Sequence, residues 1–348
     1  MKRIQFLDGL RGIAIILVVC FHAFSRWFLI VPYGDTYASF PIFKYGFLGV
    51  QLFFLISGFV ILMTLEKCQN FYIFLYKRWK RLFPAMLIAT ILIYFTATFL
   101  PERPAGIPTK SSVIPGLFFI DPLIILKVTG WNINPLEGAF WSLYVEVKFY
   151  IAFGFCYFLL GKEKSIIAIF IMFLMSIIGP ALHIHFIAVL SKILSFSHFG
   201  WFAAGSLAYL YFVNKKCKYL YFSIFVSLLE IYQYHDDYGK LFFSVLILLI
   251  FYLPIYFEKV KFIIGNSIFL FFGFISYPLY LIHENAMIAL ICKLDKLIDI
   301  TYILLPLIPI LILVLISYII AKRIEPFLQK SINRMNDYML SRLNFYKK

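Results

Sequence analysis

Apolar runs of about 20 residues recur along the whole chain, and short polar or basic segments separate them. An α-helix rises about 1.5 Å per residue, so about 20 apolar residues cross the hydrocarbon core of a bilayer. The pattern therefore predicts an all-α fold, a polytopic bundle of about ten transmembrane helices. The expected spans are 9–30, 46–65, 83–100, 140–160, 165–182, 197–213, 219–232, 241–257, 266–290 and 303–321.

The basic residues between the spans indicate the orientation of the bundle. If the N-terminus is inside, the inner segments hold 21 Lys and Arg residues and the outer segments hold nine. This asymmetry follows the positive-inside rule, so we expect both termini in the cytoplasm. Any even number of spans gives the same orientation, so this argument does not fix the helix count.

The spacing of the spans also predicts the domain organisation. Residues 1–325 are expected to form one transmembrane domain, followed by a basic cytoplasmic tail, 326–348. The longest connection, 101–139, is then external and contains an apolar stretch, 113–126, that is too short to span comfortably. This stretch is either a lid or re-entrant piece over an outer cavity, or an ordered loop without a function.

Composition narrows the class of protein. Hydrophobic residues make up 63% of the chain and charged residues only 14%, whereas a soluble domain carries about 25% charge. The net charge of +15 would suggest nucleic acid in a soluble protein. Here the basic residues flank membrane spans, so we expect the lipid bilayer and no nucleic acid as partner. The five cysteines are scattered and predict neither disulfides nor a metal site.

Ionisable residues inside a membrane are costly and usually functional. Arg11 and His22 share the first span, and eleven residues turn a helix by about 1100° and raise it by about 16 Å. Both side chains therefore face the same way, although Arg11 snorkelling to the interface and a structural His22 remain alternatives. Glu146 is expected at the depth of His22, which would give a general base held by a carboxylate. Ser142 precedes Glu146 by one turn and shares its face.

Further polar residues lie in or beside the spans. Lys148 faces away from Glu146 and either pairs with another carboxylate or snorkels, while His283 and Glu284 either join the outer cavity or form a structural pair. Arg78 and Arg81 share a helix face and suit phosphate groups, although a positive flank or contact with anionic lipid explains them equally.

Ser57 and Gly58, small residues in the second span, indicate close helix packing or, less commonly, a substrate passage.

Several motifs together resemble the acyltransferase-3 family of integral membrane acyltransferases. They cover almost the whole chain in the family's order. Each motif alone is weak evidence, but six of them in the same order are specific for the family. The motifs are Leu7 to Ala14 with Phe21 and His22, Leu52 to Phe59, Arg78 to Pro84, Trp141 to Glu146 with Phe149 and Tyr150, Ile275 to His283, and Glu325 with Pro326.

The resemblance implies an O-acyltransferase that moves an acyl group, commonly acetyl from cytoplasmic acetyl-CoA, to a hydroxyl of a cell-envelope carbohydrate or lipid-linked sugar. The resemblance implies that Arg11 and His22 are catalytic, and that Arg78 and Arg81 interact with the CoA phosphates. Joined with the spacing arguments, it predicts Glu146 as a third catalytic residue and Ser57 on the donor's path. We also expect support from Asp8, Trp141, Ser142, Tyr150, His283 and Glu284, and no metal.

The resemblance has departures and rivals. Val147 and Lys148 stand where the family often has an acidic and then a polar residue, and Ile282 stands where Trp is common. No stretch resembles the extracytoplasmic esterase-like domain of many members, so we expect that any second transfer step either needs a partner or does not occur.

The expected location is the bacterial inner membrane. The alternative function is a transporter or flippase of an envelope intermediate, which the lack of an internal repeat disfavours. A membrane scaffold would leave the intramembrane charges unexplained.

Overall fold

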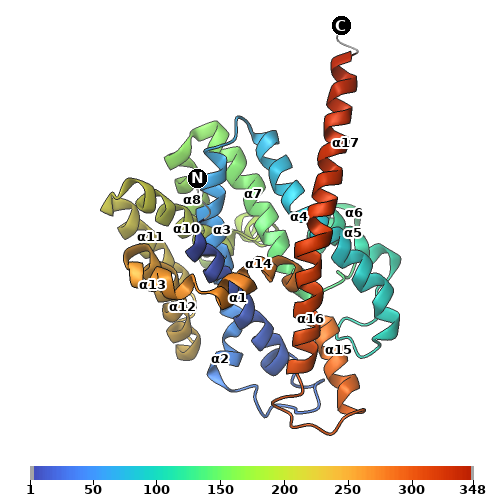
Figure 1. Ribbon diagram of the computed structural model, residues 1–348. Coiled ribbons are helices and arrows are strands. Elements are labelled where there is room, and N and C mark those ends of the chain that lie inside the picture. Colours follow the sequence, from blue (N-terminus) through green and yellow to red (C-terminus); the bar gives the residue numbers. More distant parts are fainter. Residues whose placement is uncertain (1–3, 346–348) are drawn as a thin grey trace.

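The computed structural model describes residues 4–345, with side chains described up to residue 336. All regular secondary structure in this part of the chain is helical (Figure 1), as predicted. The α-helices are α1 (Gln5–Phe21), α2 (Pro41–Lys44), α3 (Gly49–Leu65), α4 (Phe71–Thr96), α5 (Val113–Phe118), α6 (Pro122–Thr129), α7 (Trp141–Leu160), α8 (Lys162–Ala181), α9 (His185–Leu194), α10 (Phe199–Asn214), α11 (Cys217–Tyr232), α12 (Tyr238–Tyr256), α13 (Glu258–Ile264), α14 (Ser267–Ile282), α15 (Glu284–Asp295), α16 (Leu307–Ile319) and α17 (Glu325–Phe345).

Seven helices among the described residues are long and apolar enough to cross a membrane. Three bent helix pairs raise the number to ten if each pair is one span. The ten predicted spans correspond to α1, α3, α4, α7, α8, α10, α11, α12, α14 and α16. The shortest predicted span, α11, has 16 residues and is not among the candidates. The chain is therefore an integral membrane protein, and the cytoplasmic position of its termini stays a prediction.

The predicted external segment contains one of the bent pairs. Helices Lys110–Phe118 and Pro122–Thr129 meet at 110°, which is the geometry of a broken span or a re-entrant loop. Lys148 on α7 holds this corner, because its Nζ lies 2.5 Å from Oδ2 of Asp121, the N-cap of α6. Lys148 thus pairs with the carboxylate of Asp121. This is one of the two alternatives that the sequence left open.

Several of the predicted elements have different ends in the structure. The helix α4 begins at Phe71, well before the predicted span 83–100, so Arg78 and Arg81 lie within it. The predicted span 266–290 divides at His283, where α14 ends and α15 begins. The new helix start is stabilised because Glu137 accepts the backbone N–H of Asn285, 3.0 Å away. At the other end of the chain, α16 continues through the π-turn η7 (Ile320–Ile324) into α17, which extends beyond the bundle in Figure 1.

Glycines allow the helices that carry the candidate site to approach closely. A Cβ atom on Gly273 of α14 would lie 1.9 Å from the carbonyl oxygen of Asp8 on α1. A Cβ atom on Gly58 of α3 would lie 2.0 Å from the carbonyl oxygen of Phe202 on α10. Backbones at this distance gain van der Waals contact, which drives helix association where lipid removes the hydrophobic effect. The predicted close packing of the second span is confirmed at Gly58.

Candidate active site

A cavity of about 90 Å³ lies between α1, α3, α4, α7 and α14. Its lining brings together side chains that are far apart in the sequence, and we call it the arginine cavity. The predicted site residues that line it are Arg11, Ser57, Arg78, Arg81, Ser142, Glu146 and Tyr150. The structure therefore gathers both motif arginines of α4 with the arginine of α1.

Positive charge dominates the arginine cavity, because three guanidinium groups face one carboxylate. Arg11 is also paired outside the lining, with Nη1 3.0 Å from Oδ1 of Asp8. Glu146 accepts hydrogen bonds from the hydroxyl groups of Ser57 and Tyr150, the latter at 2.5 Å. These contacts hold the carboxylate on the wall of the cavity.

Arg78 has unused hydrogen-bond donors. Its Nη2 lies 3.4 Å from Oγ1 of Thr64, a weak contact. Its Nε and Nη1 atoms are buried and have no partner among the described residues. Buried charged donors without partners are costly in a folded protein. This lining therefore fits an anionic ligand with several oxygen acceptors, such as a phosphate group.

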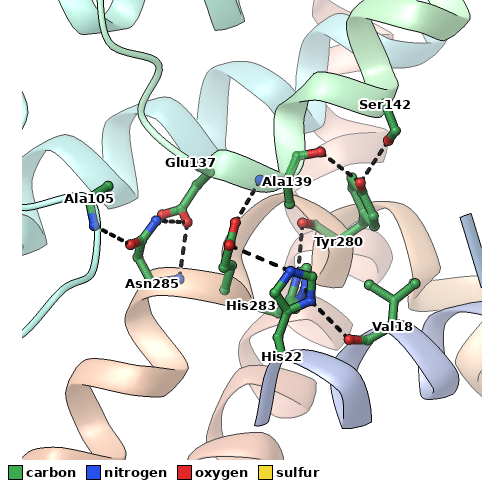
Figure 2. A network of polar contacts seen from close by, with 10 residues as sticks. Val18, His22, Ala105, Glu137, Ala139, Ser142, Tyr280, His283 and Asn285 are labelled. Atoms are coloured by element: carbon green, nitrogen blue, oxygen red, sulfur yellow. Dashed lines mark hydrogen bonds and ion pairs between the residues drawn. The ribbon is translucent and has the colours of Figure 1, made fainter. Parts of the chain in front are cut away.

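A second group of polar residues surrounds His22 at the end of α1 (Figure 2), where the helix loosens into the π-turn η1 (His22–Arg26). We call it the carboxylate–histidine network, and its members are His22, Arg103, Glu137, His283, Glu284 and Asn285. It does not line the arginine cavity.

The hydrogen bonds of the network fix the tautomers of both histidines. Nδ1 of His22 lies 2.9 Å from the carbonyl oxygen of Val18, and Nδ1 of His283 lies 2.9 Å from that of Tyr280. A carbonyl oxygen only accepts, so both Nδ1 atoms carry the hydrogen when the rings are neutral. The lone pair on Nε2 of His283 then faces Nδ1 of His22 at 3.1 Å.

The tautomer leaves Nε2 of His22 free for chemistry. This atom lies 3.5 Å from Oε1 of Glu284, and the two side chains are 11% and 4% exposed. An unprotonated ring nitrogen beside a carboxylate can take a proton as a general base, and the carboxylate then stabilises the imidazolium. Within the described residues, no group of three or more His, Cys, Asp and Glu side chains is arranged to hold a metal ion.

The predicted pairing of His22 with Glu146 was wrong, because the carboxylate beside His22 is that of Glu284. The break at His283 starts a new helix, and its first residue turns toward the end of α1. Glu146 instead lies within α7, where it faces Ser57 of α3.

Tyr280 connects the two regions. It lines the arginine cavity, and its hydroxyl donates to the carbonyl oxygen of Ala139 at 2.6 Å and lies 2.7 Å from Oγ of Ser142. Its own carbonyl accepts from His283. A single residue thus contacts both the cavity lining and the histidine pair.

The other candidates lie at the edges of these regions. Asp8 holds Arg11, and Trp141 is 42% exposed with its ring centroid 5.3 Å from that of His198. Sequence reasoning missed Arg103, Glu137 and Asn285. Arg103 and Glu137 belong to a segment that reads as an exposed loop, so no local pattern marks them as buried.

A family model described as an acyltransferase domain matches residues 4–322. The chain belongs to the acyltransferase-3 family. The resemblance seen in the motifs is thereby confirmed over nearly the whole chain.

Curated relatives agree with the family. The O-acetyltransferase OatA of Staphylococcus aureus strain NCTC 8325 / PS 47 is 34% identical over 196 residues, which cover 52% of this chain and 30% of OatA. OatA of strain MRSA252 gives the same values. The match thus spans less than a third of the length of these relatives. No solved structure matches this acyltransferase-family chain.

Proposed function

We propose that this chain is an O-acyltransferase of the bacterial inner membrane. It moves an acetyl group from cytoplasmic acetyl-CoA to a hydroxyl of a cell-envelope carbohydrate. Family membership and relatives named O-acetyltransferase support the class of reaction. The observation that supports the donor is that Nε and Nη1 of Arg78 are buried without a partner among the described residues, beside a cavity that Arg78 shares with Arg11 and Arg81.

The donor binds through its phosphate groups. Arg78 and Arg81 offer planar donors that match phosphate oxygens, and the positive-inside rule puts them near the cytoplasmic face. The cavity of about 90 Å³ is much smaller than the roughly 300–1,000 Å³ of sites for drug-sized ligands. Only part of acetyl-CoA therefore fits inside, and we assign this part to the pantetheine arm, which passes Ser57 on its way toward Tyr280 and His22.

The chemistry is acyl transfer from sulfur to oxygen. The acceptor oxygen attacks the thioester carbonyl carbon, the carbon–sulfur bond breaks, and the hydroxyl proton passes to Nε2 of His22 and on to the CoA sulfur. Glu284 stabilises the imidazolium that forms in this step. In an alternative sequence, Nε2 of His22 first takes the acetyl group and then passes it to the acceptor. Both sequences yield free CoA thiol and an acetyl ester.

The test uses the full chain in lipid nanodiscs with radiolabelled acetyl-CoA and a bacterial envelope extract. Wild type is expected to release CoA thiol and to label the polysaccharide fraction, and His22→Ala is expected to do neither. His183→Ala, at an exposed histidine, is the matched control. Near-normal acetylation by His22→Ala would contradict the proposed role of His22.

The same assay distinguishes the proposed acetyl transfer from the alternative function. A transporter or flippase of an envelope intermediate would consume no acetyl-CoA, and CoA would not bind to the arginine cavity. Absence of both turnover and CoA binding in the presence of envelope extract would therefore favour transport or another acyl donor.

A further inference from the structure

Two buried carboxylates, Glu137 and Glu284, each lie at the start of one helix and accept a backbone N–H at the start of the other helix. Figure 2 shows Glu137 beside Asn285. Glu137 directly precedes η5 (Gly138–Phe140) and α7, and Glu284 is the first residue of α15. Oε2 of Glu284 accepts the backbone N–H of Ala139 at 2.6 Å, and Oε2 of Glu137 accepts that of Asn285 at 3.0 Å. Helix N-termini carry partial positive charge, so this exchange of carboxylates favours the approach of two ends that would otherwise repel.

Arg103 balances the charge of Glu137. Glu137 and Glu284 are 1% and 4% exposed, and two carboxylates buried so close together repel one another. Nη2 of Arg103 lies 3.0 Å from Oε1 of Glu137 and 2.9 Å from the carbonyl oxygen of Leu136. The side chains of this ion pair are 2% and 1% exposed, so solvent screens it little.

Asn285 ties the same group of residues together. Its side-chain amide donates to Oε2 of Glu137, and its Oδ1 accepts the backbone N–H of Ala105 at 2.8 Å. The segment 103–105 is therefore held to Glu137 by an ion pair and to the start of α15 by the amide of Asn285.

We propose that Glu137 is a positioning residue for His22. Paired with Arg103, Glu137 fixes the start of α15, so that Glu284 keeps one oxygen on Ala139 and the other toward Nε2 of His22. The inference rests on the proposed function only for the catalytic role of His22. The proposal gives the ion pair between Arg103 and Glu137, both in the segment 101–139, a role in positioning His22.

The charges around His22 make the proposal testable. The described groups that face it are Glu284 and His283, behind them Glu137 and Arg103, and on its own π-turn the exposed Arg26. A neutral residue at position 137 would leave the buried Arg103 without its carboxylate partner. Arg103 would then draw Glu284 away from His22. Removal of Arg103 as well would remove this competition.

The experiment compares Glu137→Gln with the double variant Arg103→Gln/Glu137→Gln in nanodiscs. Glu137→Gln should lower kcat for CoA release from acetyl-CoA by roughly 10- to 100-fold, with KM unchanged, because a catalytic pair is displaced. The double variant should recover most of the loss. Glu102→Gln is the matched control, since Glu102 is the neighbour of Arg103 in the chain and its Oε1 lies 3.5 Å from Nζ of the exposed Lys296, in a separate ion pair at the end of α15.

A second readout does not depend on acetyl-CoA. Diethylpyrocarbonate modifies unprotonated imidazole nitrogens, and mass spectrometry reports the rate at His22, with the exposed His183 and His235 as internal references. Glu137→Gln should raise the rate at His22 severalfold, because Nε2 loses its carboxylate neighbour. The double variant should return it to the wild-type value.

The outcomes separate the two proposals. If wild type releases no CoA, the proposed function fails, and the modification rates still decide the positioning of His22. If Glu137→Gln matches Glu102→Gln in modification rate, or if the double variant is further from wild type than the single one, the positioning role is overturned.

Asn285→Ala is the second variant, for the case that Glu137→Gln does not accumulate in the membrane. It removes the amide contacts and keeps both charges. It should shift both readouts in the same direction by a smaller factor, and wild-type behaviour in both would overturn the proposal.

Discussion

The arginine cavity and the carboxylate–histidine network are both enclosed by helices, yet they pair their polar atoms differently. In the cavity, Nε and Nη1 of Arg78 have no partner among the described residues. In the network, both oxygens of Glu137 and both oxygens of Glu284 have a polar neighbour within 3.5 Å. The network also has one unused donor, Nε of Arg103, but Arg103 keeps its ion pair with Glu137. The contrast is therefore that Arg78 has no carboxylate partner among the described residues, whereas both carboxylates of the network are occupied.

This difference indicates different tasks. Buried charged donors without partners destabilise the protein until an anion binds to them. The hydrogen bonds that form on binding then contribute to the affinity for that anion. Occupied carboxylates hold a neighbouring base in one orientation, which lowers the reorganisation needed during the reaction. Changes in the cavity should therefore act mainly on KM for the donor, and changes in the network mainly on kcat.

The largest expected effect is that of His22→Ala on the network. Loss of the proposed general base should lower kcat by about 10²–10⁴-fold, while the affinity for CoA stays at the wild-type value. Initial rates of CoA release and calorimetric titration with CoA measure the two quantities. A loss of CoA affinity equal to the loss of rate would show that His22 acts in donor binding. It would contradict the division of roles between the cavity and the network.

Arg78→Ala tests the cavity. Hydrogen bonds to charged groups contribute about 1.5–3 kcal/mol, so KM for acetyl-CoA should rise roughly 10- to 100-fold with a smaller change in kcat. Lys77→Ala is the control, because it removes an adjacent cation whose Nζ contacts Cys68 instead of the cavity. Equal effects of the two variants would show that the general positive charge of this part of α4, and not the cavity, attracts the donor.

Gly273→Ala tests whether the close contact between α14 and α1 supports the arginine cavity. The added Cβ would lie 1.9 Å from the carbonyl oxygen of Asp8, the residue that holds Arg11. Overpacking of this kind costs about 1–3 kcal/mol, so the thermal midpoint in detergent should fall and KM for acetyl-CoA should rise. Gly116→Ala is the control, since its nearest neighbour is the flexible Met86 side chain at 3.3 Å. Equal midpoints for both variants would contradict a tight α1–α14 contact.

The smallest expected effect comes from Gly138→Ala in the network. A Cβ here would lie 3.0 Å from Oε2 of Glu284, so the carboxylate has to move by a few tenths of an ångström. We expect kcat for CoA release to fall by a factor of about 2 to 10, with KM for acetyl-CoA unchanged. A change in KM alone would show that Glu284 acts in donor binding.

Much of the site could be predicted because its residues follow helix periodicity. Arg78 and Arg81 share a face, and the structure puts both at the cavity with Arg11. The pairing of His22 could not be predicted in the same way. Depth counted along two helices suggested Glu146, but the chain breaks at His283 and brings Glu284 closer. Periodicity does not report where a helix stops when the cap comes from a distant segment.

The sequence alone determined the helical class, the ten apolar segments and most of the polar residues that line the cavity. These properties are local, because a helix in lipid satisfies its own backbone and exposes an apolar surface whatever its neighbours are. The tertiary structure decided which carboxylate faces His22 and that Arg103 and Glu137 are buried. Those properties depend on which helix ends meet, and hydrogen bonds between residues 137 and 285 leave no periodic trace in the chain.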